Sequence, residues 1–238
     1  MKVVLDIETI QAPREEWARL AGKVPEDHAF EPAEGSYDLF TAGAADERRR
    51  IDDEQYAKSA FDGTFSQIVC IGLLEFSDQL EPRGAVAWFG GDERELLRQF
   101  WSRLAQSRPS LFITHNGLGF DLPFIRKRSM IHQVKPSVEV NLAKFRTEPV
   151  YDTMAVWSNW DTRGWVKLDV LARALNVETK SGSGSQVAEM WEKGQGLELA
   201  RYCLQDTYVT YACYSRMNFR QPLSSEVVLL QPELLNVG

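Results

Sequence analysis

The chain opens with Lys2-Val3-Val4-Leu5-Asp6-Ile7-Glu8, an apolar and β-branched run that reaches two acidic residues without a turn. Such a run predicts a buried β-strand. Residues two apart in a strand point to the same face, so the carboxylates of Asp6 and Glu8 should lie side by side at its end. Two adjacent carboxylates repel each other unless a cation lies between them. A solvated strand end has the same pattern, so the pair alone does not define a site.

A second acidic position lies in Asn116-Gly117-Leu118-Gly119-Phe120-Asp121, directly after the predicted strand 111–114. The two glycines suit a tight turn, and Asp121 is expected to begin a helix. Aspartate is also a common helix N-cap. Taken by itself, the loop is as consistent with a plain strand-to-helix connection as with a functional site.

A third acidic position lies on a predicted helix that runs from Leu197 to about Met217. Tyr202 and Asp206 are four residues apart, so their side chains should project from one face of this helix. Asp206 lies close to an apolar stripe that contains Leu199, Cys203, Val209, Ala212 and Cys213. A carboxylate near a core needs a partner, usually a metal ion or a base.

Together the three segments resemble the motifs of the DEDDy 3′→5′ exonucleases: D-x-E in the first strand, N-x₃-F-D after a later strand, and Y-x₃-D in the last helix. The segments 67–72, 167–169 and 186–187 also look like stand-alone bacterial exonucleases related to the proofreading domain of family B DNA polymerases. The resemblance covers most of the chain outside residues 11–63. The related DEDDh branch has histidine five residues before the last aspartate, where this chain has Arg201.

The resemblance implies a site that holds two Mg²⁺ or Mn²⁺ ions. Asp6 would bridge the ions, and Glu8 and Asp206 would hold the one that lowers the pKa of the attacking water. Asp121 would hold the second ion, partly through water. Carboxylate oxygens without Cys or His suit these hard cations, and two ions about 3.5–4 Å apart can clamp both the attacking and the leaving oxygen. A phenol has a pKa of about 10, so Tyr202 is expected to orient the water rather than take its proton.

Four further residues are expected to contact the nucleic acid. Asn116 would form a hydrogen bond with the 3′ end, and Phe120 would pack on the terminal nucleotide. The alternatives are a role in the turn for Asn116 and a place in the core for Phe120, and for Phe120 the core is favoured. Arg126 and Lys127 begin a segment in which cations alternate with Phe145, Trp157, Trp160 and Trp165. This alternation is typical of single-strand binding. The alternative is a solvated charged face over core tryptophans, with Trp157 in the core.

The net charge of −7 is unevenly distributed along the chain. Residues 126–180 contain ten basic and six acidic side chains, a local balance of +4 that leaves −11 for the remainder. This suits an enzyme that must release a polyanionic product better than a tight duplex-binding regulator. The three cysteines form no C-x-x-C pair and are expected to be buried, reduced thiols. No signal peptide or run of about 20 apolar residues occurs, so we expect a cytoplasmic protein without a membrane partner.

The predicted fold is α/β, a ribonuclease H-like mixed sheet with helices on both faces. Residues 1–222 are expected to form one exonuclease domain, interrupted by a partly mobile excursion over about 11–63 that ends in a charged helix, Glu47–Ala60. Residues 181–185 read as a flexible loop and residues 223–238 as a peripheral tail. Strands are expected over 67–74, 86–89 and 149–151 besides those already named.

The favoured function is stepwise hydrolysis of single-stranded DNA from its 3′ end to 5′-mononucleotides. Three alternatives remain open at this point: an exoribonuclease with the same site, a catalytically silent nucleic-acid-binding domain, and a ribonuclease H-like endonuclease. No polymerase region is recognised in the chain, so we expect any proofreading or repair role to be exerted in trans.

Overall fold

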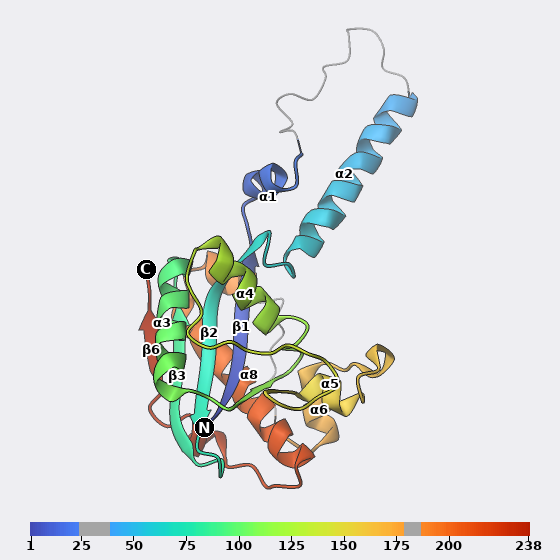
Figure 1. Ribbon diagram of the computed structural model, residues 1–238. Helices are drawn as coiled ribbons and strands as arrows, with labels where there is room; N and C mark the ends of the chain where they lie inside the picture. Colours follow the sequence, from blue (N-terminus) through green and yellow to red (C-terminus); the bar gives the residue numbers. More distant parts are fainter. Residues whose placement is uncertain (24–38, 179–186) are drawn as a thin grey trace. The chain divides into compact units, whose positions relative to one another are not determined.

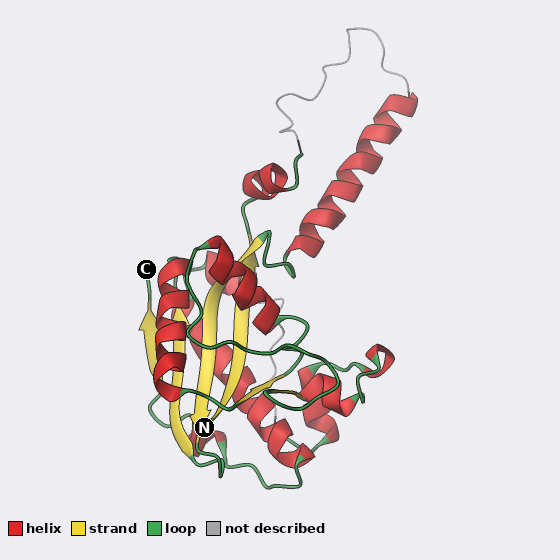
Figure 2. Ribbon diagram, viewed as in Figure 1, coloured by secondary structure: helices red, strands yellow, loops and turns green. Residues whose placement is uncertain are grey.

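The structure, a computed structural model, describes residues 1–23, 39–178 and 187–238. Within these ranges, six strands form one mixed sheet in the order β5-β4-β1-β2-β3-β6 (Figures 1 and 2). The strands are β1 Lys2–Gln11, β2 Ser66–Phe76, β3 Pro82–Phe89, β4 Leu111–Thr114, β5 Val150–Asp152 and β6 Glu233–Asn236. The β2–β3 pair is antiparallel, whereas β4 runs parallel to both β1 and β5, and β6 runs parallel to β3.

Helices cover both faces of the sheet. Figure 1 shows α3 (Glu93–Ser107) and α4 (Asp121–Ile131) in front of the strands and α8 (Gly196–Met217) behind them. Shorter helices complete this part of the chain: α5 Thr153–Trp157, η2 Thr162–Gly164, α6 Leu168–Ala174, α7 Val187–Glu192 and α9 Ser225–Val228. The predicted α/β class, with a mixed sheet between helical layers, is confirmed. No helix in the described ranges combines the length and apolar character needed to cross a bilayer.

The alternation of side chains along β1 divides the protein into two packing layers. Val3, Leu5 and Ile7 are buried in the core that also contains the apolar stripe of α3. The opposite face of the sheet packs on α8, where the ring of Phe76 stacks on Tyr211 with centroids 4.5 Å apart. Because Asp6 and Glu8 alternate with the residues of the first layer, they lie on the α8 side of β1.

Gly72 lets helix α8 approach the sheet closely. A Cβ atom at this position would lie 2.8 Å from Cys203 Sγ. Real Cβ atoms do not come so close to a neighbouring heavy atom, so any other residue would push the helix away from the strand. All three cysteines are buried free thiols, as expected from the sequence.

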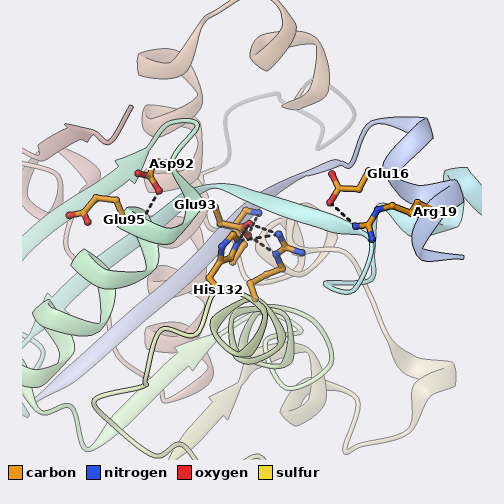
Figure 3. A network of polar contacts seen from close by, with 8 residues as sticks. Glu16, Arg19, Asp92, Glu93, Glu95 and His132 are labelled. Carbon is orange, nitrogen blue, oxygen red and sulfur yellow. Dashed lines mark hydrogen bonds and ion pairs between the residues drawn. The ribbon is translucent and has the colours of Figure 1, made fainter.

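A buried ionic cluster fixes the position of α4, the helix that begins at Asp121. The carboxylate of Glu93 accepts hydrogen bonds from the Ile68 backbone N–H at 2.7 Å, from Arg128 Nε at 2.9 Å and from His132 Nε2 at 2.7 Å (Figure 3). Charge-assisted bonds of this kind are stronger than neutral ones. These bonds join the first residue of α3, strand β2 and the last turn of α4. Arg128, one of the cations of the basic segment 126–180, therefore forms an ion pair within the protein.

Residues Ile10–Gln67 form a second compact unit, separate from the unit made by Met1–Thr9 and Ile68–Gly238. It contains α1 (Arg14–Leu20) and α2 (Leu39–Ser59). The rings of Trp17 and Tyr56 meet edge to face with centroids 5.4 Å apart, and the Tyr56 hydroxyl donates to the Ala12 carbonyl at 2.9 Å. On α1, Arg19 forms an ion pair with Glu16 (Figure 3).

Two expectations about chain segments need correction. Helix α2 begins at Leu39, not at Glu47, and three of the eight additional residues are alanines, which favour a helix despite one glycine. Residues 223–238 are more than a peripheral tail: they supply the edge strand β6, and Val237 N donates to the Phe89 carbonyl at 2.8 Å. The predicted flexible loop 181–185, and most of the anchor-poor stretch 24–43, lie outside the described residues.

Candidate active site

Strand β1 extends beyond its pairing with β4, and Asp121, at the start of α4, lies against the unpaired edge of β1 at Ile7. The parallel pairing runs from Lys2 with Leu111 to Val4 with Ile113, and β4 ends at Thr114. The backbone N–H of Ile7 is therefore not used in the ladder with β4, and it donates to Asp121 Oδ1 at 3.1 Å. The carboxylate of Asp121, which is 3 % exposed, is thus fixed beside the two acids of β1.

Helix α8 completes the cluster from the other side of β1. The carboxylate oxygens of Asp6 and Glu8 and the Sγ atom of Cys203 all lie within 4.8 Å of one another. Cys203 Sγ is 3.7 Å from Asp6 Oδ2. One turn farther along the helix, Asp206 accepts a hydrogen bond from the Tyr202 hydroxyl. Three segments that are distant in sequence therefore bring their acidic side chains to one place.

Burial and mutual repulsion raise the pKa of both acids of β1. For Asp6, burial has the largest effect, and the negative charges of Glu8, Asp121 and Asp206 raise the pKa further. For Glu8, which is 8 % exposed, burial again comes first, followed by the charges of Asp206 and Asp121. Glu8 and Asp206 therefore lie close enough to interact, as a shared coordination sphere requires.

The other two carboxylates are shifted in the same direction. Burial raises the pKa of Asp121 to about 7, against the opposing effect of hydrogen bonds from two backbone N–H groups, its own and that of Ile7. Burial raises the pKa of Asp206 to about 6, and the hydrogen bond from Tyr202 opposes this shift. Glu8 and Asp121 are buried, and Asp6 and Asp206 are partly buried. Four such acids are costly to ionise together, so the charge of the site calls for a cation. All four donors are carboxylates, which suits a hard divalent ion.

Comparisons with known proteins identify the family of this chain. Residues 61–228 match the model of a family described as predicted 3′-5′ exonucleases related to the exonuclease domain of PolB. The chain belongs to this family. The resemblance seen in the sequence is thereby confirmed at the level of the PolB-related exonuclease family.

Relatives of this PolB-related family member include several proteins named DNA polymerase. The chain is 25 % identical to the DNA polymerase of Pyrococcus glycovorans over 213 residues, which cover 78 % of this chain and 26 % of the polymerase. It is 24 % identical to DNA polymerase 1 of Pyrococcus abyssi over the same length, and 28 % identical to the DNA polymerase of Thermococcus gorgonarius over 138 residues. The chain spans about a quarter or less of these relatives.

Asp152 is a residue of the PolB-related chain that the sequence did not reveal as part of the site. Its carboxylate caps α5 by accepting from the N–H groups of Met154 and Ala155, at 3.1 and 3.2 Å. It also accepts from the N–H groups of Asn116 and Leu118, each at 2.9 Å. The sequence is consistent with a helix cap at Asp152, because aspartate is a common N-cap residue. Nothing in the sequence indicates its hydrogen bonds to Asn116 and Leu118. Asp152 therefore positions the loop that leads to Asp121.

We expect Asp152→Ala to lower the free energy of unfolding by about 3 kcal/mol or more, because it leaves four N–H groups without their acceptor. Urea unfolding measures the loss. Asp161→Ala is the matched control, since Asp161 caps the exposed η2 and also pairs with the exposed side chain of Arg163. Loss of these surface contacts should leave stability nearly unchanged. Equal losses in the two variants would show that the bonds to the loop contribute nothing beyond a helix cap.

The four expected substrate contacts occupy different settings. Asn116 is half-buried and in the left-handed region, with φ of 66°. Phe120 is partly buried and packs against the core, edge to face with Phe124. Arg126 is exposed beside an apolar pocket and Lys127 is half-buried. Trp157, expected in the core, is instead exposed, because α5 is short and buries Ala155 rather than its last residue.

Proposed function

We propose that this chain is a metal-dependent 3′→5′ exonuclease that shortens single-stranded DNA from its 3′ end and releases 5′-mononucleotides. The observation that carries the proposal is the convergence of Asp6, Glu8, Asp121 and Asp206 from three segments of the chain. The pKa of each of the four carboxylates is raised, with burial as the largest cause. Membership of a family of predicted 3′-5′ exonucleases supports the direction of attack. The relatives reported above are named as DNA polymerases, which favours DNA over RNA.

The four carboxylates are proposed to hold two Mg²⁺ or Mn²⁺ ions. Asp6 interacts with all three of the other acids, so it would help to hold both ions. Glu8 and Asp206 interact with each other and would share one ion, and Asp121 would hold the second. When bound, two such ions lower the pKa of a water ligand and stabilise negative charge on the scissile phosphate.

Tyr202 is proposed to orient the attacking water. Burial, followed by the negative charges of Asp206 and Glu8, raises the pKa of the phenol well above its usual value. The hydroxyl therefore keeps its proton at neutral pH and acts as a hydrogen-bond donor, not as a general base. In the reaction the water oxygen bonds to phosphorus, the 3′-oxygen of the preceding nucleotide leaves, and a proton passes from the water to that oxygen.

Tyr202→Phe is expected to lower the rate of hydrolysis by about 100-fold, because one positioned hydrogen bond is lost from the transition state. Affinity for Mn²⁺, measured by calorimetry, should change little. Tyr208→Phe on the same helix is the control, since that hydroxyl donates to the Leu223 carbonyl instead. If both variants keep full activity, the phenol of Tyr202 has no part in catalysis.

Asn116 and Phe120 are proposed to contact the terminal nucleotide, and Arg126 and Lys127 to contact phosphates. Asn116 lies on the loop before Asp121, and Arg126 is exposed on α4, the helix that Asp121 begins. Arg126 and Lys127 therefore both lie on α4, the helix that begins with the proposed metal ligand Asp121. Phosphate contacts of this kind position a strand without reading its sequence.

The proposal is tested with a 5′-labelled single strand and purified protein in Mg²⁺ or Mn²⁺. A ladder that shortens from the 3′ end, releases mononucleotides and stops in EDTA is the expected result. A circular single strand should remain intact, and an RNA strand of equal length should be degraded more slowly. Cleavage of the circle would identify an endonuclease, and binding without metal-dependent cleavage would identify a silent nucleic-acid-binding domain.

A further inference from the structure

A pocket of about 260 Å³ opens next to the loop that leads to Asp121. Asn116 and Gly119 of that loop line it on one side, together with the carboxylate residue Asp152. Asp152 accepts hydrogen bonds from the N–H groups of Asn116 and Leu118, so the pocket adjoins the loop that leads to the proposed metal ligand Asp121. Asn116, already proposed to contact the terminal nucleotide, lines this space, and the proposed function gives no role to the rest of it.

Three aromatic rings form the other walls: Phe145, Trp160 and Trp165. Phe145 is 77 % exposed and Trp165 is 45 % exposed, so neither ring is a core residue. The centroids of Phe145 and Trp160 are 6.0 Å apart with their planes at 42°, so the two rings are tilted and do not stack on each other. Exposed rings that gather around one hollow mark a binding surface.

The backbone around these rings is held in an unfavourable conformation. Phe145 has φ of 62° and Trp160 has φ of 60°, both in the left-handed region that bulky residues avoid. Non-glycine residues stay in this region only where the surrounding structure forces them, and they cluster at ligand sites. Asn116, across the pocket, has φ of 66°.

Polar groups at the pocket fit a base with an attached phosphate. The indole Nε1–H of Trp160 is buried and has no acceptor among the residues that the structure describes. A base carbonyl or ring nitrogen could accept from this donor once the indole turns toward the pocket. Lys144 also lines the pocket, where its ammonium group can meet a backbone phosphate. The segment is anchored nearby, because His115 Nε2 lies 3.1 Å from the Val166 carbonyl.

We propose that this pocket binds one nucleobase near the 3′ end of the single strand, stacked on the rings of Phe145 and Trp165. The proposal rests on the proposed function and adds to it a subsite for a base. The volume lies below the about 300–1,000 Å³ of pockets for drug-sized ligands, which suits one flat ring system and not a run of nucleotides.

The test measures binding of strands that carry 2-aminopurine at each of the last four positions, whose fluorescence falls when the base stacks. All proteins carry Asp6→Asn, so that the strand is not degraded. We expect quenching at one position, lost in the double variant Phe145→Ala/Trp165→Ala. Phe219→Ala is the matched control, because Phe219 is 100 % exposed and has φ of 57°, much like Phe145.

A strand that lacks the base at the quenched position completes a double-mutant cycle. Removal of the base should weaken binding to the parent protein by about 5- to 150-fold, and removal of the two rings should weaken binding of the intact strand similarly. Removal of the base and the rings together should weaken binding no more than either change alone. Independent, multiplying losses, or quenching at no position, would overturn the pocket proposal.

The double-mutant cycle tests the base subsite and the hydrolysis assay tests the exonuclease proposal, so a failure of one can be distinguished from a failure of the other. If the strand is shortened from its 3′ end but the cycle shows independent losses, the proposed function stands and the base subsite does not. If the cycle shows full coupling and the protein without Asp6→Asn cleaves nothing, the pocket remains a base-binding site and the exonuclease proposal is wrong.

Discussion

Asp6→Asn is expected to lower metal-dependent hydrolysis by about 1,000-fold or more and, at the same time, to raise the melting temperature of the metal-free protein. The loss follows because a shared ligand of the catalytic ions contributes several kcal/mol to the transition state. The gain follows because the neutral amide removes a buried charge that Glu8, Asp121 and Asp206 repel. Rates are measured with a labelled strand, and melting is followed by calorimetry in EDTA.

The opposite signs of the two effects make this variant informative. Asp78→Asn, at an exposed acid that pairs with the N-terminal ammonium, is the control and should keep full activity. A fall in both activity and metal-free stability would mean that Asp6 is needed for folding and not for metal binding. Activity within tenfold of the original protein would remove Asp6 from the proposed site altogether.

The second large effect expected is a stabilisation by Mn²⁺ that grows with pH. At a free concentration of about 100 times its dissociation constant, a ligand of the folded state adds about 2.7 kcal/mol, or roughly 5–10 °C in melting temperature for a chain of this size. The ions bind deprotonated carboxylates, and protons compete with them at low pH. The rise in melting temperature caused by Mn²⁺ should therefore be small at pH 5.5 and should reach its full size at pH 8.

The same carboxylates determine how the stability of the metal-free protein changes with pH. An acid with a raised pKa in the folded state binds protons more readily there than in the unfolded chain, so stability falls as pH rises between the two pKa values. For Asp206 that window runs from 3.8 to about 6, and for Asp121 from 3.8 to about 7. Comparison with and without Mn²⁺ at each pH separates these groups from others that titrate nearby, such as His115.

Asp6→Asn should lose most of the Mn²⁺ shift, whereas Asp78→Asn should keep it. An equal shift at pH 5.5 and pH 8, or none at either, would show that the ion does not bind to these carboxylates.

The sequence predicted the parts of the site that depend on local periodicity. The two-residue repeat of a strand places Asp6 and Glu8 on one face, and the four-residue spacing on a helix places Tyr202 beside Asp206. The structure has both arrangements. The convergence of the three segments came from their resemblance to a known family, because spacing within each segment says nothing of the distance between them.

Features that depend on contacts between distant segments were not predictable. Asp152 reads locally as a helix cap, yet two of its four bonds reach residues more than 30 positions earlier in the chain. Strand β6 has no strong strand pattern of its own and forms by pairing with β3. The left-handed backbone at Phe145 and Trp160 has no sequence signal, since neither is glycine or asparagine.

The contact between Cys203 and Asp6 joins residues 197 positions apart in the chain. Closing so long a loop has a high entropic cost, and contacts of such high order form late during folding. A folding intermediate in which the last long helix has not docked lacks Tyr202 and Asp206 at the site, whatever the state of the sheet. Recovery of nuclease activity during refolding would then report completion of the whole α/β core, and not the earlier collapse of its strands.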